Sequence, residues 1–339
     1  MLKLPFGKYP VFGKDDPEYA YACGRVKALE TRLLDRVRFE RLATAKDFED
    51  LLKLLQDTDY SKYLNEVHSP ADYEIILRRE LEKLFTLVSE LSVDKTLERD
   101  LRITYDFLNI KILVKSVIFE ADFSPYYTRY SYYPISVIRF CIESGKLERV
   151  EPFLIKAYEE AIASYYEKKE IYRIDTAVDR VMYEYLTSKT AFEYLGILFN
   201  IKADLNNLLT FLRLERLNRL ESYGNFSLPG GYLPREVFSK VSDFQTLLHE
   251  IRHTVYYDVI TPGYQYYLKT GSYVRLERDI ASYINGFIRL GGAKDLGVEP
   301  LIAYYFKKRN EIGLLRMIMV SKLNDLPKEQ ILERIPEVV

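Results

Sequence analysis

The sequence predicts an all-α protein, and three observations support this fold class. Apolar residues recur at steps of three and four along most of the chain, which is the period of an amphipathic helix. Glycine and proline number only 15 and 13 in 339 residues, so long helices can run uninterrupted. No sustained alternation of apolar and polar residues is bounded by hairpin turns, so we expect no sheet.

The first predicted helix begins at Asp16-Pro17-Glu18. Aspartate is a favoured capping residue, proline fits the first helical position, and an acid in the first turn interacts favourably with the helix dipole. The apolar residues that follow are spaced by four, three, four and four, which indicates one continuous stripe. They are Ala22, Val26, Leu29, Leu33 and Val37.

Two further helix starts follow along the chain. Thr44 and Asp47 have the spacing of a capping box, with aspartate in place of the usual glutamate, and Ser69-Pro70-Ala71-Asp72 is a similar start. Each start precedes an apolar face, and comparable stripes recur later. The stripes comprise Phe48, Leu51, Leu52 and Leu55; Tyr73, Leu77, Leu81, Leu84, Val88 and Leu91; Leu97, Leu101, Tyr105, Leu108 and Ile112; and Val237, Val241, Phe244, Leu248, Ile251 and Val255.

Two irregular stretches divide this helical pattern. The first runs from Phe123 to Pro134 and the second from Phe226 to Pro234, and their starts lie 103 residues apart (226 − 123). Such a spacing suggests internal repeats. We therefore predict three related helical units at residues 1–122, 123–225 and 226–339, arranged with pseudo-threefold symmetry.

A faint sequence repeat supports the three units. The pattern Asp-x-x-Asn occurs twice and has a weaker match in Lys-x-x-Glu; the second residues of the three pairs are separated by 98 and 104 (207 − 109; 311 − 207). We expect these second residues to occupy equivalent places that face a shared interior, axis or interface, the alternative being ordinary polar residues on a helix surface. The pairs are Asp106 with Asn109, Asp204 with Asn207, and Lys308 with Glu311; the bases that follow are Lys115, Arg213 and Arg316, and the upstream acids are Glu80, Asp179 and Asp279.

Composition narrows the functional classes. A formal net charge of -1 provides no basic field to attract nucleic acid. Two cysteines, Cys23 and Cys141, form neither a disulfide framework nor a metal cluster, which suits a reducing cytoplasm. The first ten residues do not resemble a signal peptide, and no apolar run approaches the length of a spanning helix, so we expect membrane attachment only through partners.

One motif points to an enzyme. His249-Glu250-Ile251-Arg252-His253 matches H-E-x-x-H, in which two histidines one helical turn apart bind zinc and the glutamate acts as a base. The apolar stripe from Val237 to Val255 would place the motif on a helix, and Glu277 is a candidate third ligand. The sequence therefore contains an alternative function, that of a zinc metallopeptidase.

Physical arguments weigh against that alternative. Arg252 would put a cation beside the metal, which electrostatics disfavours. The motif helix would also lack the sheet on which zinc peptidases of this kind usually rest. No phosphate-binding loop is present either, because neither Gly230-Gly231 nor Gly291-Gly292 is followed by the required lysine. We expect no catalytic residue, no bound metal and no cofactor.

Four segments carry a resemblance to a known family. Residues 308–318 (KRNEIGLLRMI) and 322–331 (KLNDLPKEQI) resemble the closing signature of the C subunit of archaeal and bacterial A/V-type ATPases, the equivalent of the d subunit in the eukaryotic vacuolar pump. Residues 21–30 (YACGRVKALE) and 106–111 (DFLNIK) resemble other recurrent segments of that family. The likeness extends over nearly the whole length, although the middle unit is hard to match and the family gives the two histidines no known role.

The resemblance implies a funnel-shaped helical protein without an ATP site. It implies a non-catalytic rotor subunit in the central stalk, which receives the foot of the central shaft and seats on the proteolipid ring. Its task would be to couple ATP hydrolysis or synthesis to proton or sodium transport. It would lie at the cytoplasmic face of the membrane as a peripheral part of the complex.

Overall fold

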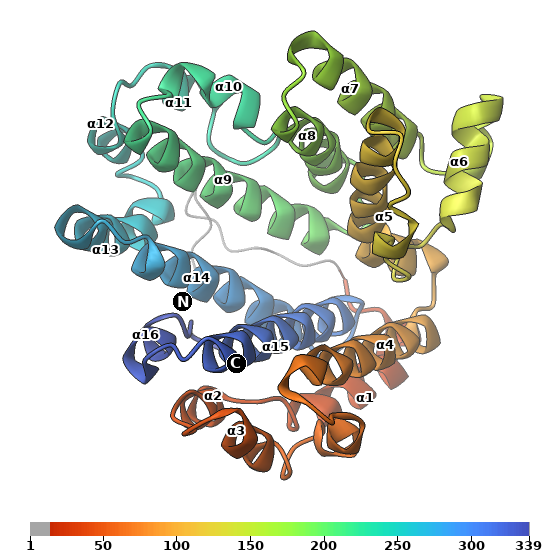
Figure 1. Ribbon diagram of the computed structural model, residues 1–339, viewed down its shortest axis with the longest axis vertical. Helices are drawn as coiled ribbons and strands as arrows, with labels where there is room; N and C mark the ends of the chain where they lie inside the picture. Colours follow the sequence, from red (N-terminus) through yellow and green to blue (C-terminus); the bar gives the residue numbers. More distant parts are fainter. Residues whose placement is uncertain (1–13, 339) are drawn as a thin grey trace. The chain divides into compact units, whose positions relative to one another are not determined.

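A computed structural model describes residues 14–338, and every regular element in that range is a helix (Figure 1). No strand occurs within it, so the all-α prediction is confirmed for the described residues. The chain divides into two compact units. One contains the described residues up to Val93 together with those from Ile251 onward, and the other is Asp94–Glu250.

The unit built from both ends of the chain is organised around its longest helix. That helix, α15, packs against α1, α2, α3, α4 and α14, and Figure 1 shows it between α4 and α14. It has buried residues on every side, which is the pattern of a central helix rather than an amphipathic surface helix. The helices of this unit are α1 Ala20–Glu30, α2 Arg36–Ala43, α3 Phe48–Leu54, α4 Tyr73–Leu91, α13 Val255–Thr270, α14 Val274–Gly292, α15 Glu299–Leu323 and α16 Lys328–Glu333.

The Asp94–Glu250 unit is built from long helices in which α8 packs against α5, α7 and α9. Aromatic side chains pack between them: the ring of the buried Tyr185 lies 6.5 Å from that of the buried Phe107 and 5.6 Å from that of the partly buried Phe153. The helices are α5 Lys95–Ile118, α6 Ile135–Ser144, α7 Pro152–Lys168, α8 Tyr172–Ser188, α9 Glu193–Arg216, α10 Tyr223–Phe226, α11 Arg235–Ser239 and α12 Phe244–Glu250.

The two expected breaks are present. The first connects α5 to α6 and contains only a 3-10 turn at Ser124–Tyr126, and the second connects α10 to α11. Pro134 and Pro234 stand at the same place in the two connections, directly before the next helix, with extended backbone. A proline there disfavours helix at the preceding residue, so each connection stays irregular up to the proline.

The ends of α5, α9 and α15 share one geometry. Each helix is followed by a non-glycine residue in the left-handed region, at φ values of 49°, 52° and 51°. In each, the N–H beyond that residue donates to the carbonyl five residues back, which is the Schellman arrangement. The left-handed residues are Glu120, Asn218 and Asp325, and the donor–acceptor pairs are Ala121 with Ser116, Arg219 with Leu214, and Leu326 with Ser321.

Of three helix signals predicted in the first part of the chain, two are wrong and one is confirmed. The predicted stripe from Ala22 to Val37 is not one helix: α1 ends at Glu30, Asp35 caps α2, and Val37 is 72% exposed. The predicted box at Thr44 is also wrong, because Asp47 itself caps α3 by accepting the Asp50 N–H at 2.8 Å. The capping box of Ser69 and Asp72 is confirmed.

The predicted helix from Val237 to Val255 is interrupted. α11 ends at Ser239, α12 runs from Phe244 to Glu250, and α13 begins at Val255. The Asp243 carboxylate accepts the Thr246 N–H at 2.8 Å, so it caps a new helix where the apolar spacing alone indicated a continuous one.

Candidate functional site: polar clamps on the long helices

We call a clamp a pair of polar side chains, one helical turn apart, that holds the backbone of another segment against the helix. The first clamp is on α5 and holds the connection that follows this helix. Asn109 is buried; its amide donates to the Thr128 carbonyl at 3.0 Å, and its Oδ1 accepts the Thr128 N–H at 2.8 Å. Asp106, one turn earlier, accepts the Tyr132 and Tyr133 N–H groups at 2.9 and 2.8 Å. Two side chains thus satisfy four backbone groups of an irregular segment, which would otherwise cost free energy when buried.

The second clamp repeats these bonds on α9. Asn207 donates to the Leu228 carbonyl at 3.0 Å and accepts the Leu228 N–H at 2.8 Å. Asp204 accepts the Tyr232 and Leu233 N–H groups at 2.7 and 3.1 Å. The residue types, their spacing and the paired acceptance all match those of α5.

Gly231 is required by the second clamp. Its φ is +91°, a region that side-chain-bearing residues rarely adopt. A Cβ at this position would also lie directly against the Asp204 carboxylate. The connection can therefore approach α9 closely only because this residue has no side chain.

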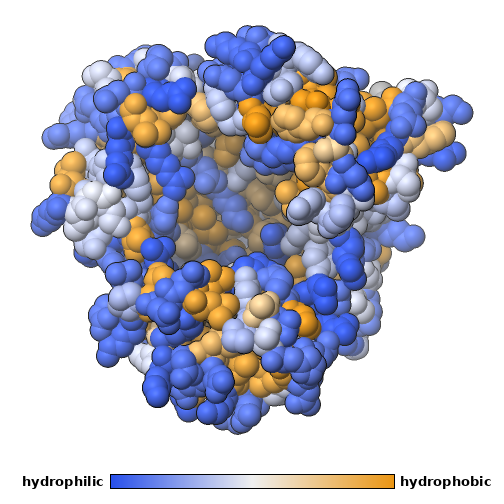
Figure 2. All heavy atoms as spheres, in the orientation of Figure 1, coloured by the Kyte–Doolittle hydropathy of each residue, from blue (hydrophilic) through white to orange (hydrophobic). Residues whose placement is uncertain are grey.

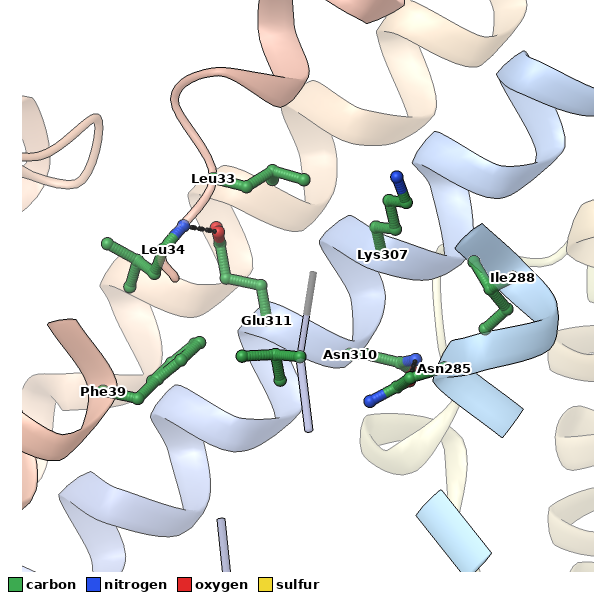
Figure 3. Close-up of a pocket in the computed structure, with 9 residues that line it drawn as sticks. Leu33, Leu34, Phe39, Asn285, Ile288, Lys307, Asn310 and Glu311 are labelled. Atoms are coloured by element: carbon green, nitrogen blue, oxygen red, sulfur yellow. Dashed lines mark hydrogen bonds between the residues drawn. The ribbon is translucent and has the colours of Figure 1, made fainter. Parts of the chain in front are cut away.

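The third candidate, Glu311 on α15, holds a segment from the other end of the chain. Its Oε2 accepts the Leu34 N–H at 2.6 Å, and its Oε1 accepts the Tyr60 hydroxyl at 2.7 Å. Lys308, one turn earlier, donates to Glu311 at 2.5 Å and lies 3.2 Å from Glu80. All of these side chains are buried. Figure 3 shows the Glu311 carboxylate pointing at the Leu34 backbone.

A small cavity adjoins this third clamp. Leu33, Phe39 and Ile288 supply apolar walls, and Asn310 donates to the Oδ1 of Asn285 at 2.8 Å beside them (Figure 3). Lys307, at its edge, is paired with Glu30 at 3.2 Å. The polar groups around the cavity are thus paired with one another, as buried polar groups usually are.

Ion pairs join the long helices to their neighbours in both units. On the α5 side, Lys111 and Lys115 pair with Asp179 and Asp175 of α8 at 2.6 and 2.9 Å. On the α15 side, Lys308 and Arg316 pair with Glu80 and Glu74 of α4 at 3.2 and 2.5 Å. Among the acids predicted from the repeat, Glu80 and Asp179 therefore join two helices, whereas Asp279 pairs with its own neighbour Arg278 at 3.0 Å.

Burial and charge shift the acidity of several clamp residues. Desolvation raises the pKa of Asp106 to about 7, although the N–H bonds from Tyr132 and Tyr133 pull in the opposite direction. Burial also opposes ionisation of Glu80, but the attraction of three lysines outweighs it and lowers the pKa. Burial and the neighbouring Glu311 raise the pKa of the Tyr60 hydroxyl, so it stays protonated and donates a hydrogen bond to that carboxylate.

The structure does not support the zinc alternative. α12 ends at Glu250, so only His249 lies on that helix, whereas His253 lies in the turn that follows. The H-E-x-x-H motif needs one continuous helical turn to bring both rings to a metal. His249, His253 and Glu277 are all exposed, and residues 14–338 contain no group of three or more acidic, histidine or cysteine side chains that could hold a metal ion.

The clamps use buried polar side chains to hold backbone in place. Residues 22–334 match the family model described as ATP synthase (C/AC39) subunit. The chain therefore belongs to this family, and it is one part of such a complex rather than an enzyme by itself. The zinc metallopeptidase interpretation has no support from the family match.

The chain is also similar to C subunits of rotary ATPases from several organisms. The C subunit of the A-type ATP synthase of Methanocaldococcus jannaschii is 24% identical over 342 residues, covering 92% of this chain and 85% of that protein. The C subunit of the V-type sodium ATPase of Enterococcus hirae is 24% identical, covering 92% and 96%. The C subunit of the A-type ATP synthase of Thermococcus onnurineus is 27% identical, covering 95% and 90%.

Across the described part of the chain, no helix is both long and apolar enough to span a bilayer.

Proposed function

We propose that this protein is the non-catalytic rotor subunit that couples the central shaft of a V/A-type ATPase to the proteolipid ring. The observation that carries this proposal is the family match over residues 22–334, together with relatives named as the C subunits of A-type ATP synthases and of a V-type sodium ATPase. The protein lies at the cytoplasmic face as a peripheral part of the complex, and its rotation serves ATP-driven proton or sodium transport or ATP synthesis.

A rotor adaptor must resist twisting, and the clamps supply that resistance. A hydrogen bond between a neutral side chain and backbone contributes roughly 0.5–1.5 kcal/mol and one from a charged side chain roughly 1.5–3 kcal/mol, and these bonds are shielded from water. They fasten the irregular connections to the long helices, where a packed helical protein would otherwise be softest. Torque applied at one end is then carried by helices whose connections cannot slide.

The repeated geometry supports three related units in a funnel-shaped body with pseudo-threefold symmetry. The helix pairs α4–α5, α8–α9 and α14–α15 have lengths of 19 and 24, 17 and 24, and 19 and 25 residues. Their second helices carry the clamps and share the Schellman end. In this proposal the units divide near Phe123 and Phe226. Counted back from the left-handed residue, Asn109 and Asn207 stand at the same place, 11 residues before it (120 − 109; 218 − 207), whereas Glu311 stands 14 residues before it (325 − 311), at the place of Asp106 and Asp204.

The third unit receives its connection from the start of the chain. Leu33 and Leu34 precede α2 as Tyr132 and Tyr133 precede α6, and Leu34 is held by Glu311 as the tyrosine backbone is held by Asp106. In this proposal the segment before α2 is to α15 what the segment before α6 is to α5.

Contacts with the shaft and the ring would be protein–protein interfaces that use exposed aromatic side chains with charged rims. Tyr21, Tyr126 and Tyr166 are 70%, 71% and 60% exposed. Figure 2 shows charged and polar residues over much of the visible surface, with apolar areas among them.

A bridging assay tests the proposal. Membrane vesicles that carry the ring are mixed with purified shaft proteins from the same organism, with and without this protein, and sedimented. We expect the shaft to sediment with the vesicles only when this protein is present. Equal sedimentation of the shaft without it would contradict the coupling role.

A further inference from the structure

A polar pocket in the Asp94–Glu250 unit lies apart from the clamps. It has a volume of about 260 Å³ and lies between α7, α8 and α10, three helices that are neighbours in Figure 1. Arg173, Thr176 and Arg180 of α8 line it together with Ser164 of α7 and Asn225 of α10. One carboxylate, that of Glu160, belongs to the lining as well.

The local sequence explains why the pocket is open and positively charged. Arg173, Thr176, Ala177 and Arg180 are spaced by three, one and three, which puts them on one face of α8. Both guanidinium groups therefore line the same space. Ala177 and, on α7, Ala163 are too small to fill it.

The Arg173 side chain is largely buried, and one of its donor nitrogens makes no hydrogen bond. Its side chain is only 12% exposed, and its Nη1 has no hydrogen bond although it is fully buried. The Oε2 of Glu167 lies 2.8 Å from that nitrogen, but outside hydrogen-bond geometry, and the Glu167 side chain is 62% exposed. Arg173 is thus paired with a carboxylate but not fully hydrogen-bonded, and a buried cation is costly unless it is both, so an anion in the adjoining pocket would be favourable.

The other lining groups can bind the same anion. Arg180 makes only a 3.5 Å contact with the Gly224 carbonyl. The side chains of Ser164 and Asn225 make no hydrogen bond with any described residue, so a hydroxyl and an amide are available. Donors thus come from three helices and surround the space from different sides, which suits a tetrahedral oxyanion better than a planar carboxylate.

We propose that this pocket binds a phosphate group, either as inorganic phosphate or as the phosphomonoester of a lipid headgroup. Guanidinium groups match phosphate oxygens in pairs, and the N-terminal turn of α8, where Arg173 lies, adds favourable dipole charge. The carboxylates of Glu160 and Glu167 repel a bound anion and so lower its affinity. The site does not depend on the coupling role, so either can fail alone.

The test titrates the full-length protein with inorganic phosphate by calorimetry, with ionic strength held constant by chloride. We expect saturable binding that Arg180→Gln weakens about tenfold or more, because charge-assisted hydrogen bonds are lost. Arg173→Lys keeps the positive charge but loses the paired N–H donors of the guanidinium group, so it should weaken binding too. Arg78→Gln, an exposed arginine of α4, is the matched control and should bind as the parent does.

Vesicles distinguish the two sources of phosphate. Sedimentation with phosphatidate vesicles, but not with phosphatidylcholine vesicles, identifies a lipid headgroup if Arg180→Gln reduces it, and binding of free phosphate alone identifies the soluble ion. Circular dichroism checks that each variant is folded, and Ser164→Ala supplies a milder change. The proposal is overturned if neither form of phosphate binds saturably, or if the folded arginine variants bind like the parent.

Discussion

The Leu34 N–H donates to the Glu311 carboxylate at 2.6 Å, although the two residues are 277 positions apart. This bond joins the beginning of the chain to its longest helix. It holds the segment between the end of α1 at Glu30 and the start of α2 at Arg36 against α15.

Removing the Glu311 carboxylate should destabilise the protein strongly. Glu311→Ala leaves Lys308 with one fewer buried partner and leaves the Leu34 N–H unsatisfied, and breaking such a buried pair costs about 3–5 kcal/mol. Glu311→Gln keeps an acceptor for Leu34, so its loss should be smaller. Urea unfolding measures both losses. Glu159→Ala, at an exposed site on α7, should change stability by less than about 0.5 kcal/mol; an equally small effect at Glu311 would contradict this account.

The two asparagine clamps should respond alike to one isosteric change. Asn109→Asp and Asn207→Asp replace an amide donor by an acceptor facing a backbone carbonyl, at a cost of about 1–3 kcal/mol each. The same unfolding measurement detects the loss, with exposed Asn65→Asp as control. A loss at only one of the two positions would argue against equivalent units.

Gly231→Ala should disrupt the second clamp. The left-handed backbone costs about 1–3 kcal/mol for a residue with a side chain, and the new methyl group must also displace the Asp204 carboxylate. Gly224→Ala is the matched control, because a Cβ there meets no atom within 4 Å and its backbone is helical. Thermal unfolding that ranks the two variants equally would show that the close approach at Gly231 is not needed.

Stability should fall with rising pH through Asp106. Its folded pKa of about 7 lies above the ordinary value of 3.8, so between these values the folded state holds the extra proton. The contribution is present below about pH 3.8, declines by at most about 1.4 kcal/mol per pH unit, and is gone above about pH 7. Asp106→Asn removes this titration. The stability difference between parent and variant should therefore shift in the variant's favour from about pH 5 to about pH 8; parallel curves would show that the N–H bonds keep Asp106 ionised.

The helical class and the positions of the two breaks could be predicted because they depend on local signals. The helical spacing of apolar residues and the positions of proline and glycine predicted the connections that end at Pro134 and Pro234. The same method failed at Asp35 and Asp243, where a capping side chain starts a new helix although the apolar spacing continues. The spacing of apolar residues contains no information about where a polar side chain caps a helix.

The clamp residues could be found only in part. The repeated Asp-x-x-Asn pattern singled out Asn109 and Asn207, yet it could not show that their partners are backbone groups about 20 residues further on. Tyr60 and Leu34 carried no signal, since their link to Glu311 joins distant parts of the chain. The expectation that the three residues face a common axis stays a prediction.

The central claim is tested most directly by reconstituting the ATPase in liposomes with and without this protein. ATP hydrolysis and the uptake of protons and sodium are followed in the same preparation. The account predicts that without the protein the soluble head still hydrolyses ATP while ion uptake is lost, because the shaft turns without driving the ring. Ion uptake at the full rate in its absence would contradict the account.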